Sequence, residues 1–155
     1  MSDRYFLDTN IFVYTFDDAQ PQKRTLARQL VSQALSDSKG TISYQVVQEF
    51  INIATRKFKH PLTPQDCAGY LDTVLAPLCE VFPSIDLYRD ALEVHEKWKF
   101  SYYDSLILTA ALSAGCKRLY SEDLQHGQRV RDLVIENPFR SAGIGQQSRA
   151  SGGPP

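Results

Sequence analysis

The chain contains four acidic residues, far apart in the sequence, that could supply the carboxylates of one metal site: Asp8, Glu49, Asp104 and Asp123. Carboxylate oxygens without histidine or cysteine partners favour Mg²⁺ or Mn²⁺ over zinc. Clustered carboxylates repel one another unless a cation neutralises their charge. If the fold brings these four residues together, the sequence therefore predicts a Mg²⁺ site, with Mn²⁺ as the alternative, holding either one ion or two.

Each acid also has an ordinary structural explanation. Asp8 could cap a following helical turn, because aspartate is a favoured N-cap residue. Asp104 could interact with a helix dipole, and Glu49 could form a salt bridge with Arg56 or Lys57. These explanations stay open for each acid taken alone.

Asp123 is the acid with the strongest local competitor. It belongs to the segment Ser121-Glu122-Asp123, where an aspartate is typical of a turn, and Glu122 competes with it for any role. Other site chemistries find less support in the sequence. The histidines at 60, 95 and 126 lack the spacing of zinc ligands, no serine has an evident histidine partner, and no glycine-rich phosphate loop is present.

Short apolar runs alternate with helical patterns along the chain. We predict strands at residues 5–7, 41–42, 79–82, 118–121 and 133–135. Helices are predicted for three to four turns after Pro21, from Ser43 to Ala54, over 65–75, over 86–98 and over 103–114. This alternation predicts a three-layer α/β/α domain with a mostly parallel central sheet of four to five strands.

In such a fold, ligands bind beyond the carboxyl ends of the parallel strands. Asp8 and Asp123 each follow a predicted strand, and Asp104 lies in the first turn of a helix that starts at the same edge. That helix is apolar on nearly every face and should be buried, so an acid at its start needs a partner. Glu49 lies in register with the core-facing Val46 and Phe50. We therefore expect the four acids to converge.

Four sequence motifs occur in the order that is typical of one known family. They are Phe6-Leu-Asp8-Thr-Asn10, Val46-Val-Gln-Glu49-Phe, Tyr103-Asp104-Ser-Leu-Ile-Leu and Leu119-Tyr-Ser121-Glu-Asp123-Leu. This ordered set resembles a PIN domain, and within that family it is most similar to the VapC-type toxins of toxin–antitoxin pairs. The resemblance covers about residues 4–137.

The resemblance implies a PIN-like nuclease fold and Mg²⁺-dependent endonucleolytic cleavage of RNA. It identifies Asp8, Glu49, Asp104 and Asp123 as the catalytic and metal-binding acids, with Asp8 and Asp104 as direct ligands. Glu49 and Asp123 would then hold water molecules or a second ion. The positions that support these acids would be Thr9, Asn10 and Ser121. The resemblance further implies a cognate antitoxin as a partner and a homodimer.

Candidate RNA contacts come from a local basic segment, because the formal net charge of −1 gives no global attraction for a polyanion. The best candidates are Arg56, Lys57 and Lys59, which flank Phe58. Such residues would bind phosphates without sequence preference. Tyr102 and Tyr103 could stack a base, although Tyr103 is expected to pack under the apolar helix.

The 155 residues fit one domain of ordinary size, which we assign to residues 1–140. Residues 141–155 are rich in Ser, Gly, Gln, Ala and Pro and are expected to form a disordered tail. Three scattered cysteines without a disulfide pattern and the absence of a membrane-spanning run or a leader pattern predict a cytoplasmic protein.

Two competing functions remain in view beside a ribonuclease. One is a non-catalytic PIN-fold module that binds RNA or protein, although such a module would have no need for four mutually repelling acids. The other is a metal-dependent phosphatase, but Asp8-Thr9-Asn10 lacks the second acid two residues on that aspartyl-phosphate chemistry would need.

Overall fold

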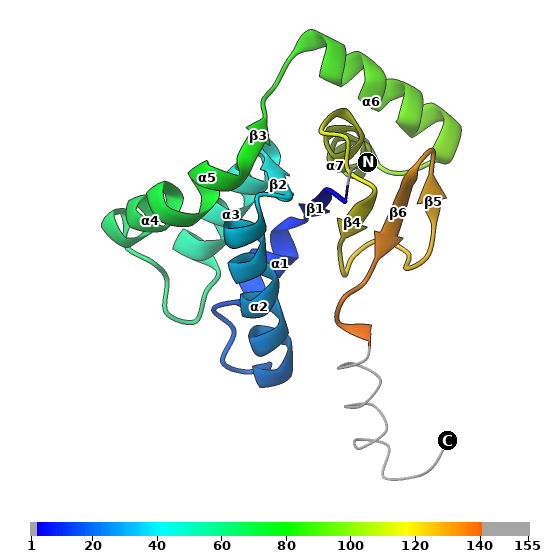
Figure 1. Cartoon of the computed structure of the whole chain (residues 1–155). Coiled ribbons are helices and arrows are strands. Elements are labelled where there is room, and N and C mark those ends of the chain that lie inside the picture. Colours follow the sequence, from blue (N-terminus) through cyan, green and yellow to red (C-terminus); the bar gives the residue numbers. More distant parts are fainter. Residues whose placement is uncertain (1–2, 141–155) are drawn as a thin grey trace, which may run out of the picture.

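The computed structural model describes residues 3–140, and its centre is a six-stranded sheet (Figure 1). The strands lie in the order β3-β2-β1-β4-β6-β5, and every neighbouring pair is parallel except β5 with β6. Their bounds are β1 Tyr5–Leu7, β2 Gly40–Ser43, β3 Cys79–Val81, β4 Arg118–Tyr120, β5 Arg129–Val130 and β6 Leu133–Glu136. The predicted mostly parallel sheet is confirmed.

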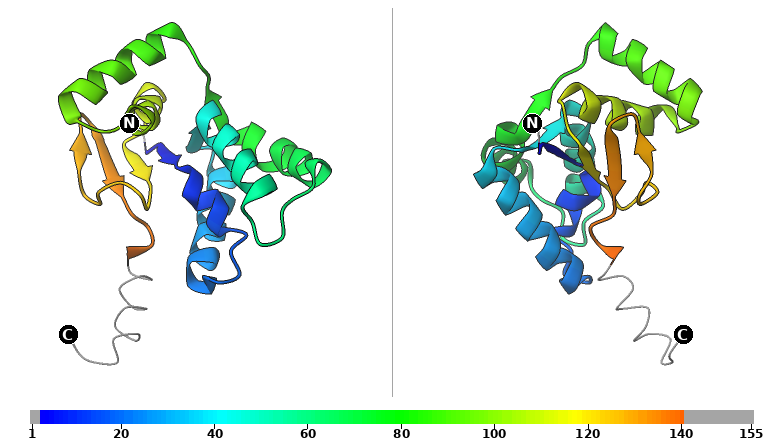
Figure 2. Two further views of the ribbon diagram at one scale, coloured as in Figure 1. Left: turned by 180° about the vertical axis from the view of Figure 1, so that it is seen from behind. Right: turned by 45° about the vertical axis from the view of Figure 1, so that its right-hand side comes forward.

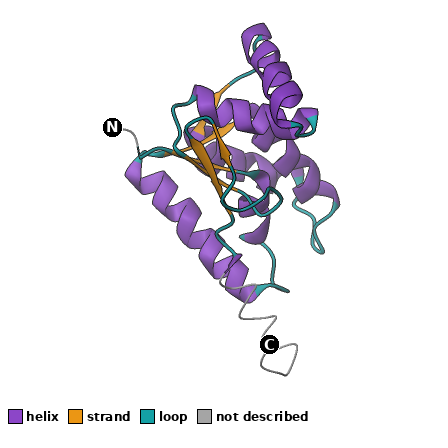
Figure 3. Ribbon diagram, turned by 90° about the vertical axis from the view of Figure 1, so that its right-hand side faces the viewer, coloured by secondary structure: helices purple, strands orange, loops and turns teal. Residues whose placement is uncertain are grey.

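Helices connect the parallel strands and cover the sheet. Their bounds are α1 Thr9–Tyr14, α2 Pro21–Asp37, α3 Tyr44–Arg56, α4 Pro64–Tyr70, the π-helical turn η1 Leu71–Leu75, α5 Ala76–Leu78, α6 Ile85–Trp98 and α7 Tyr102–Ser113. Both α2 and α7 contact β2, and Figure 3 shows helices on both sides of the strands. Helix α6 packs on the outer side of α7 (Figure 2). The three-layer α/β/α class is therefore confirmed.

The strand order creates a point where the chain changes direction across the sheet. From β1 the chain moves outward through β2 to β3, and it then returns to β4 on the other side of β1. Because parallel crossovers are right-handed, the connections before and after this reversal lie on opposite faces and leave a crevice between β1 and β4. The carboxyl ends of these two strands are therefore the expected place for a ligand.

Local sequence signals explain where several helices begin. Pro21 occupies the first turn of α2, and the hydroxyl groups of Thr63, Ser84 and Ser101 accept hydrogen bonds from the first turns of α4, α6 and α7. Helix α7 is buried from Ser105 to Ala111, as its uniformly apolar sequence predicts. The central strand β1 is buried throughout. The interior of the domain is thus built around β1 and α7.

The structure differs from the sequence-based prediction in three places. The sheet has six strands because the two-residue strand β5 pairs antiparallel with β6 as a short hairpin, and two residues are too few for a periodic pattern. The helix predicted over 65–75 continues through η1 and α5 to Leu78. The spacing in the helix predicted over 86–98 also places Leu92 with Leu87, Ala91 and Val94 on the core side, but Leu92 is 54% exposed. The predicted tail, 141–155, lies outside the described residues.

Two predictions for the whole chain concerned its cysteines and membrane-spanning segments. Cys67, Cys79 and Cys116 are all free thiols, which agrees with the predicted absence of a disulfide framework. Within the same range, no helix combines the length and apolar character that a membrane crossing requires.

Candidate active site

A pocket of about 410 Å³ lies at the carboxyl ends of β1 and β4, where the strand order reverses. All four predicted acids line it, and we call it the acidic pocket. Its lining consists of Asp8, Thr9, Asn10, Val13, Gln45, Glu49, Asn52, Ile53, Lys57, Tyr103, Asp104, Ile107 and Asp123. Residues from α1, α3 and α7 and from the segment after β4 therefore meet at one place.

Asp8 is the buried carboxylate of the acidic pocket. It follows β1 directly, caps α1 by accepting a hydrogen bond from the Thr9 backbone N–H at 2.8 Å, and accepts a second from Ser121 Oγ at 2.7 Å. Burial raises the pKa of Asp8 to about 6, and the charges of Glu49 and Asp123 add to this, while the two hydrogen bonds oppose it. The N-cap explanation is thus correct, but it leaves a costly buried carboxylate facing the pocket.

Glu49 reaches the pocket from the second turn of α3. Its two carboxylate oxygens accept hydrogen bonds from Thr9 Oγ1 at 2.6 Å and from Gln45 Nε2 at 3.2 Å. Gln45 is buried, and its Nε2 also donates to the backbone carbonyl of Tyr103 at 3.2 Å. These contacts, rather than a salt bridge with Arg56 or Lys57, hold the Glu49 side chain.

The structure separates the two neighbouring acids after β4. Asp123 lines the acidic pocket and accepts a hydrogen bond from Asn10 Nδ2 at 3.0 Å. Glu122 instead forms an ion pair with Lys23 at 2.6 Å and accepts a hydrogen bond from the Tyr14 hydroxyl group. Glu122 thereby connects the segment after β4 to α1 and α2. Of the two neighbouring acids, Asp123 is the one that lines the acidic pocket.

Asp104 lies at the rim of the pocket in the first turn of α7. Its backbone N–H is capped by Ser101 Oγ at 3.1 Å, and its side chain is partly exposed. The expectation that the apolar helix would bury the Asp104 carboxylate is therefore wrong, because the buried part of α7 begins only at Ser105. Tyr103, expected to pack under the helix, is 68% exposed for the same reason.

The three residues predicted to support the acids each contact one or two of them. Thr9 contacts Glu49, Asn10 contacts Asp123, and Ser121 donates to Asp8 while accepting from the Asp123 backbone N–H at 3.2 Å. Each acid except Asp104 therefore has a side-chain hydrogen-bond donor that orients it. Sequence reasoning missed Gln45 and Asn52, although their spacing from Glu49 on α3, four residues before and three after, places them on its face of the helix.

The three predicted RNA-binding residues lie at different distances from the acidic pocket. Lys57, the C-cap residue of α3, lines the acidic pocket. Arg56 and Lys59 are exposed and lie outside its lining, and Arg56 donates to Asn52 Oδ1 at 3.4 Å. One of the three predicted RNA-binding residues is thus placed next to the acids.

The donor set of the acidic pocket fits a divalent cation with oxygen ligands. None of the four acids forms a salt bridge within residues 3–140, so no side-chain cation among them neutralises the carboxylates. In that range, no three acidic, histidine or cysteine side chains are arranged to ligate one ion together. Mg²⁺ is commonly held by one or two carboxylates and completes its octahedron with water and phosphate oxygens. The arrangement therefore fits a hydrated ion better than an all-protein cage.

Comparison with known proteins identifies the family and the fold of the chain. A family model described as PIN domain matches residues 5–131. A search of curated protein sequences found no match. Among solved structures, a toxin–antitoxin complex from Klebsiella pneumoniae has a TM-score of 0.64 at 18% identity and covers 87% of this chain and 98% of its own.

Two further solved structures share the fold. DNA-bound VapBC from Salmonella typhimurium has a TM-score of 0.60 at 20% identity, covering 89% of this chain and 99% of its own. The sarcin–ricin-loop-cleaving toxin VapC20 of Mycobacterium tuberculosis has a TM-score of 0.57 at 18% identity, covering 76% and 88%. At these identities the likeness concerns the fold alone.

Proposed function

Because this chain belongs to the PIN domain family, we propose that its acidic pocket is the active site of a Mg²⁺-dependent endoribonuclease. The observation that carries the proposal is the convergence of Asp8, Glu49, Asp104 and Asp123 on one pocket at the point where the strand order reverses. Their mutual repulsion destabilises the fold unless a cation occupies the pocket. A purely structural role would give no reason to keep this cost.

Asp8 and Asp104 are the proposed direct ligands of the ion. The two carboxylates come from different layers of the fold, one from the end of β1 and one from the start of α7, and both line the pocket. When bound, Mg²⁺ (or Mn²⁺) would supply charge neutralisation at the phosphate and would lower the pKa of a water molecule.

We assign the two remaining acids, Glu49 and Asp123, to binding water molecules and to accepting the proton of the attacking one. Hydrolysis of a phosphodiester needs a water molecule aligned with the phosphorus and an acceptor for its proton. Glu49 is suited to accept that proton because Thr9 and Gln45 hold both of its carboxylate oxygens. Asp123 is oriented toward the pocket by Asn10 and would hold further water molecules. Lys57 would pair with a phosphate of the RNA backbone.

We further propose that the protein is the toxin of a toxin–antitoxin pair, with a cognate antitoxin as its partner and a homodimer as its assembly. The support is the fold shared with a toxin–antitoxin complex and with VapBC structures, which this chain matches over nearly their full length. A protein that binds across the acidic pocket would block access of RNA to it.

The proposal is tested by incubating the purified chain with end-labelled single-stranded RNA. We expect cleavage with Mg²⁺ or Mn²⁺, no cleavage with EDTA, and restoration when the metal is added back. Asp104→Asn should abolish cleavage. The matched control Glu122→Gln changes a neighbouring acid that pairs with Lys23 outside the pocket lining, and it should retain cleavage.

A second experiment separates hydrolysis by water from attack by the RNA's own 2′-hydroxyl group. RNA carrying a single 2′-deoxynucleotide at the cleaved position should still be cut, because the attacking oxygen comes from water.

In the first experiment, cleavage without metal, or an equal loss of cleavage in Asp104→Asn and Glu122→Gln, would contradict the assignment of the acidic pocket as the active site.

A further inference from the structure

Tyr103 stands out among the exposed apolar side chains of the molecule. Within residues 3–140, five large hydrophobic side chains are well exposed: Leu35, Phe82, Ile85, Leu92 and Tyr103. Of these, only Tyr103 lines the acidic pocket, and it is 68% exposed there. An exposed aromatic ring in the lining of a charged pocket offers an apolar face to a ligand that enters the pocket.

The backbone of Tyr103 is held in a defined place. It lies in the first turn of α7, where its carbonyl oxygen accepts the hydrogen bond from the buried Gln45 side chain at 3.2 Å. Its ring meets that of Tyr102 edge-to-face, with centroids 5.7 Å apart and an interplanar angle of 69°. Tyr102 in turn packs against the hydrophobic core. Tyr103 is thus presented by a rigid element, which lowers the entropic cost of binding to it.

Two further tyrosines lie near Tyr102 and Tyr103. Tyr44, at the start of α3, lies near enough to Tyr88 of α6 and to Tyr102 and Tyr103 that, after burial, these hydroxyl groups contribute to a raised pKa of Tyr44. All three neighbours of Tyr103 are only partly buried. We call Tyr44, Tyr88, Tyr102 and Tyr103 the tyrosine cluster. It joins three helices beside the acidic pocket.

The two surfaces match the two parts of a nucleotide. The acidic pocket, with Lys57 and the amides of Asn10 and Asn52, offers partners to a phosphate and its cation. Tyr103 offers a π-face, on which any base can stack. A base inside a duplex already has both faces covered, so an aromatic platform of this kind selects unpaired nucleotides.

We propose that Tyr103 is a specificity-determining residue that stacks on an unpaired base next to the phosphate held in the acidic pocket. The proposal rests on the proposed ribonuclease function and deepens it by naming what the enzyme recognises beside the phosphate. Tyr102 supports the ring of Tyr103 through their edge-to-face contact.

Binding is measured on the non-cleaving Asp8→Asn background by fluorescence anisotropy, with a short single-stranded RNA and with the same RNA in a duplex. We expect Tyr103→Ala to raise the Kd for the single strand by roughly 10-fold, which corresponds to the loss of one stacked base. Tyr103→Phe should retain affinity, because the π-face remains. The Kd for the duplex should not change.

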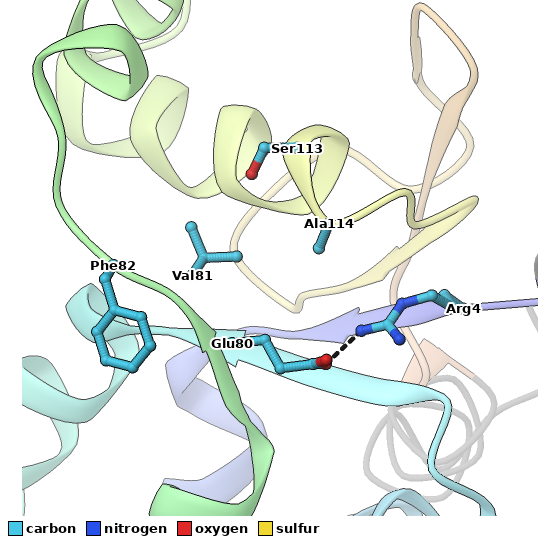
Figure 4. A pocket seen from close by; sticks show the side chains of 6 residues that line it. All are labelled: Arg4, Glu80, Val81, Phe82, Ser113 and Ala114. Carbon is cyan, nitrogen blue, oxygen red and sulfur yellow. Dashed lines mark hydrogen bonds and ion pairs between the residues drawn. The ribbon is translucent and has the colours of Figure 1, made fainter.

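Phe82 provides the matched control, because it is a similarly exposed aromatic side chain, at 63%, in a different place. It lines a separate pocket near the Arg4–Glu80 ion pair (Figure 4). Phe82→Ala should leave RNA binding unchanged. A change of equal size in Phe82→Ala and Tyr103→Ala would show a general effect of exposed aromatics and overturn the proposal.

The salt dependence of binding distinguishes stacking from phosphate contact. Lys57→Gln should reduce the slope of log K against log salt by about 0.7, the value for one phosphate contact on a single strand. Tyr103→Ala should lower affinity without changing that slope. A reduced slope in Tyr103→Ala would contradict stacking as its role.

Cleavage by the otherwise unmodified chain supplies a second readout. An abasic site next to the cleaved bond should raise the KM of the wild-type chain. The KM of Tyr103→Ala should be about the same for the abasic RNA as for the intact RNA, because the stacking contact is already absent in this variant. If Tyr103→Ala binds and cleaves intact RNA as the wild-type chain does, the stacking proposal is wrong while the ribonuclease function stands. If the wild-type chain never cleaves but binding depends on Tyr103, the ribonuclease function fails and the stacking contact stands.

Discussion

At the scale of single residues, Asp8 combines a structural task with a chemical one. Its carboxylate caps α1 through the Thr9 backbone N–H and accepts from Ser121, which joins the ends of β1 and β4. The same carboxylate is buried and faces the repelling charges of Glu49 and Asp123. The native state therefore holds Asp8 in an ionised form that water would solvate better.

This burial predicts a pH dependence of stability in the metal-free protein. The pKa of Asp8 is about 6 in the fold against 3.8 for the unperturbed residue. The folded state therefore binds this proton more tightly than the unfolded chain, and its contribution to stability is lost as the pH rises from about 4 to 6. The loss is on the order of 3 kcal/mol.

Urea unfolding in EDTA at pH 4.5 and pH 7 measures this effect. The wild-type chain should lose stability across the interval relative to Asp8→Asn, in which no carboxyl group titrates at this position. If the free energy of unfolding changed with pH in the same way in both proteins, ionisation of Asp8 would not destabilise the fold.

Gln45 is a positioning residue that acts through Glu49. Gln45→Leu removes the hydrogen bonds to Glu49 and to the Tyr103 carbonyl while keeping a side chain of similar size. We expect kcat for RNA cleavage to fall by about 10–100-fold, the usual cost of losing an orienting partner, with a smaller change in KM. Steady-state kinetics measures both values. Wild-type kcat in Gln45→Leu would contradict the role given to the Glu49 orientation.

At the scale of elements, the packing of α2 on the sheet depends on a glycine in β2. A Cβ atom on Gly40 of β2 would lie 2.4 Å from Ala34 Cβ of α2 and 3.1 Å from a ring atom of Tyr5. Tyr5 also donates from its hydroxyl group to Asp37 at 2.8 Å. The absence of a side chain at Gly40 therefore lets α2 dock on β2.

We accordingly predict that Gly40→Ala destabilises the protein by about 1–3 kcal/mol through overpacking, measured by urea unfolding. Ala34→Gly in the same chain should restore part of this loss, because it removes the clashing methyl group. Gly69→Ala is the control, since no atom lies within 4 Å of its added Cβ, and helix α4 should gain slightly from alanine. Equal stability of Gly40→Ala and the wild-type chain would show that α2 can shift without cost.

The elements that position the site were largely predictable from the sequence. Strand β1, the buried helix α7 and the cap at Thr63 follow from apolar runs and capping residues. Strand β5 was not predictable, because two residues carry no periodicity. The last helical turn, α5 Ala76–Leu78, was also missed, because it contains Pro77, a residue type that usually ends a helix.

At the scale of the whole molecule, topology supplies what local sequence could not. That the four acids share a pocket follows from the rule that parallel strands present their carboxyl ends at one edge. The choice between Glu122 and Asp123 required the three-dimensional structure, because it is decided by Lys23 on a distant helix. The exposure of Tyr103 and the role of Gln45 likewise depend on how α3 and α7 meet.

The unneutralised acidic pocket also predicts that Mg²⁺ stabilises the whole fold. A ligand that binds only the native state at about 100 times its Kd adds about 2.7 kcal/mol, which should raise the Tm on the order of 10 °C in a chain of this size. Thermal unfolding with millimolar Mg²⁺ and with EDTA measures the shift. Asp104→Asn should reduce it, and Glu122→Gln should keep it. An unchanged Tm in the wild-type chain would contradict a tight metal site.

The most direct test of the central claim is single-turnover cleavage of single-stranded RNA by the wild-type chain and by Asp8→Asn, with RNA binding measured in parallel. We predict that Mg²⁺ drives cleavage by the wild-type chain, whereas Asp8→Asn stays folded, binds the RNA and cuts it at least about 100-fold more slowly, since a direct ligand should cost more than an orienting partner. Cleavage by folded Asp8→Asn at the wild-type rate would show that the acidic pocket is not the active site.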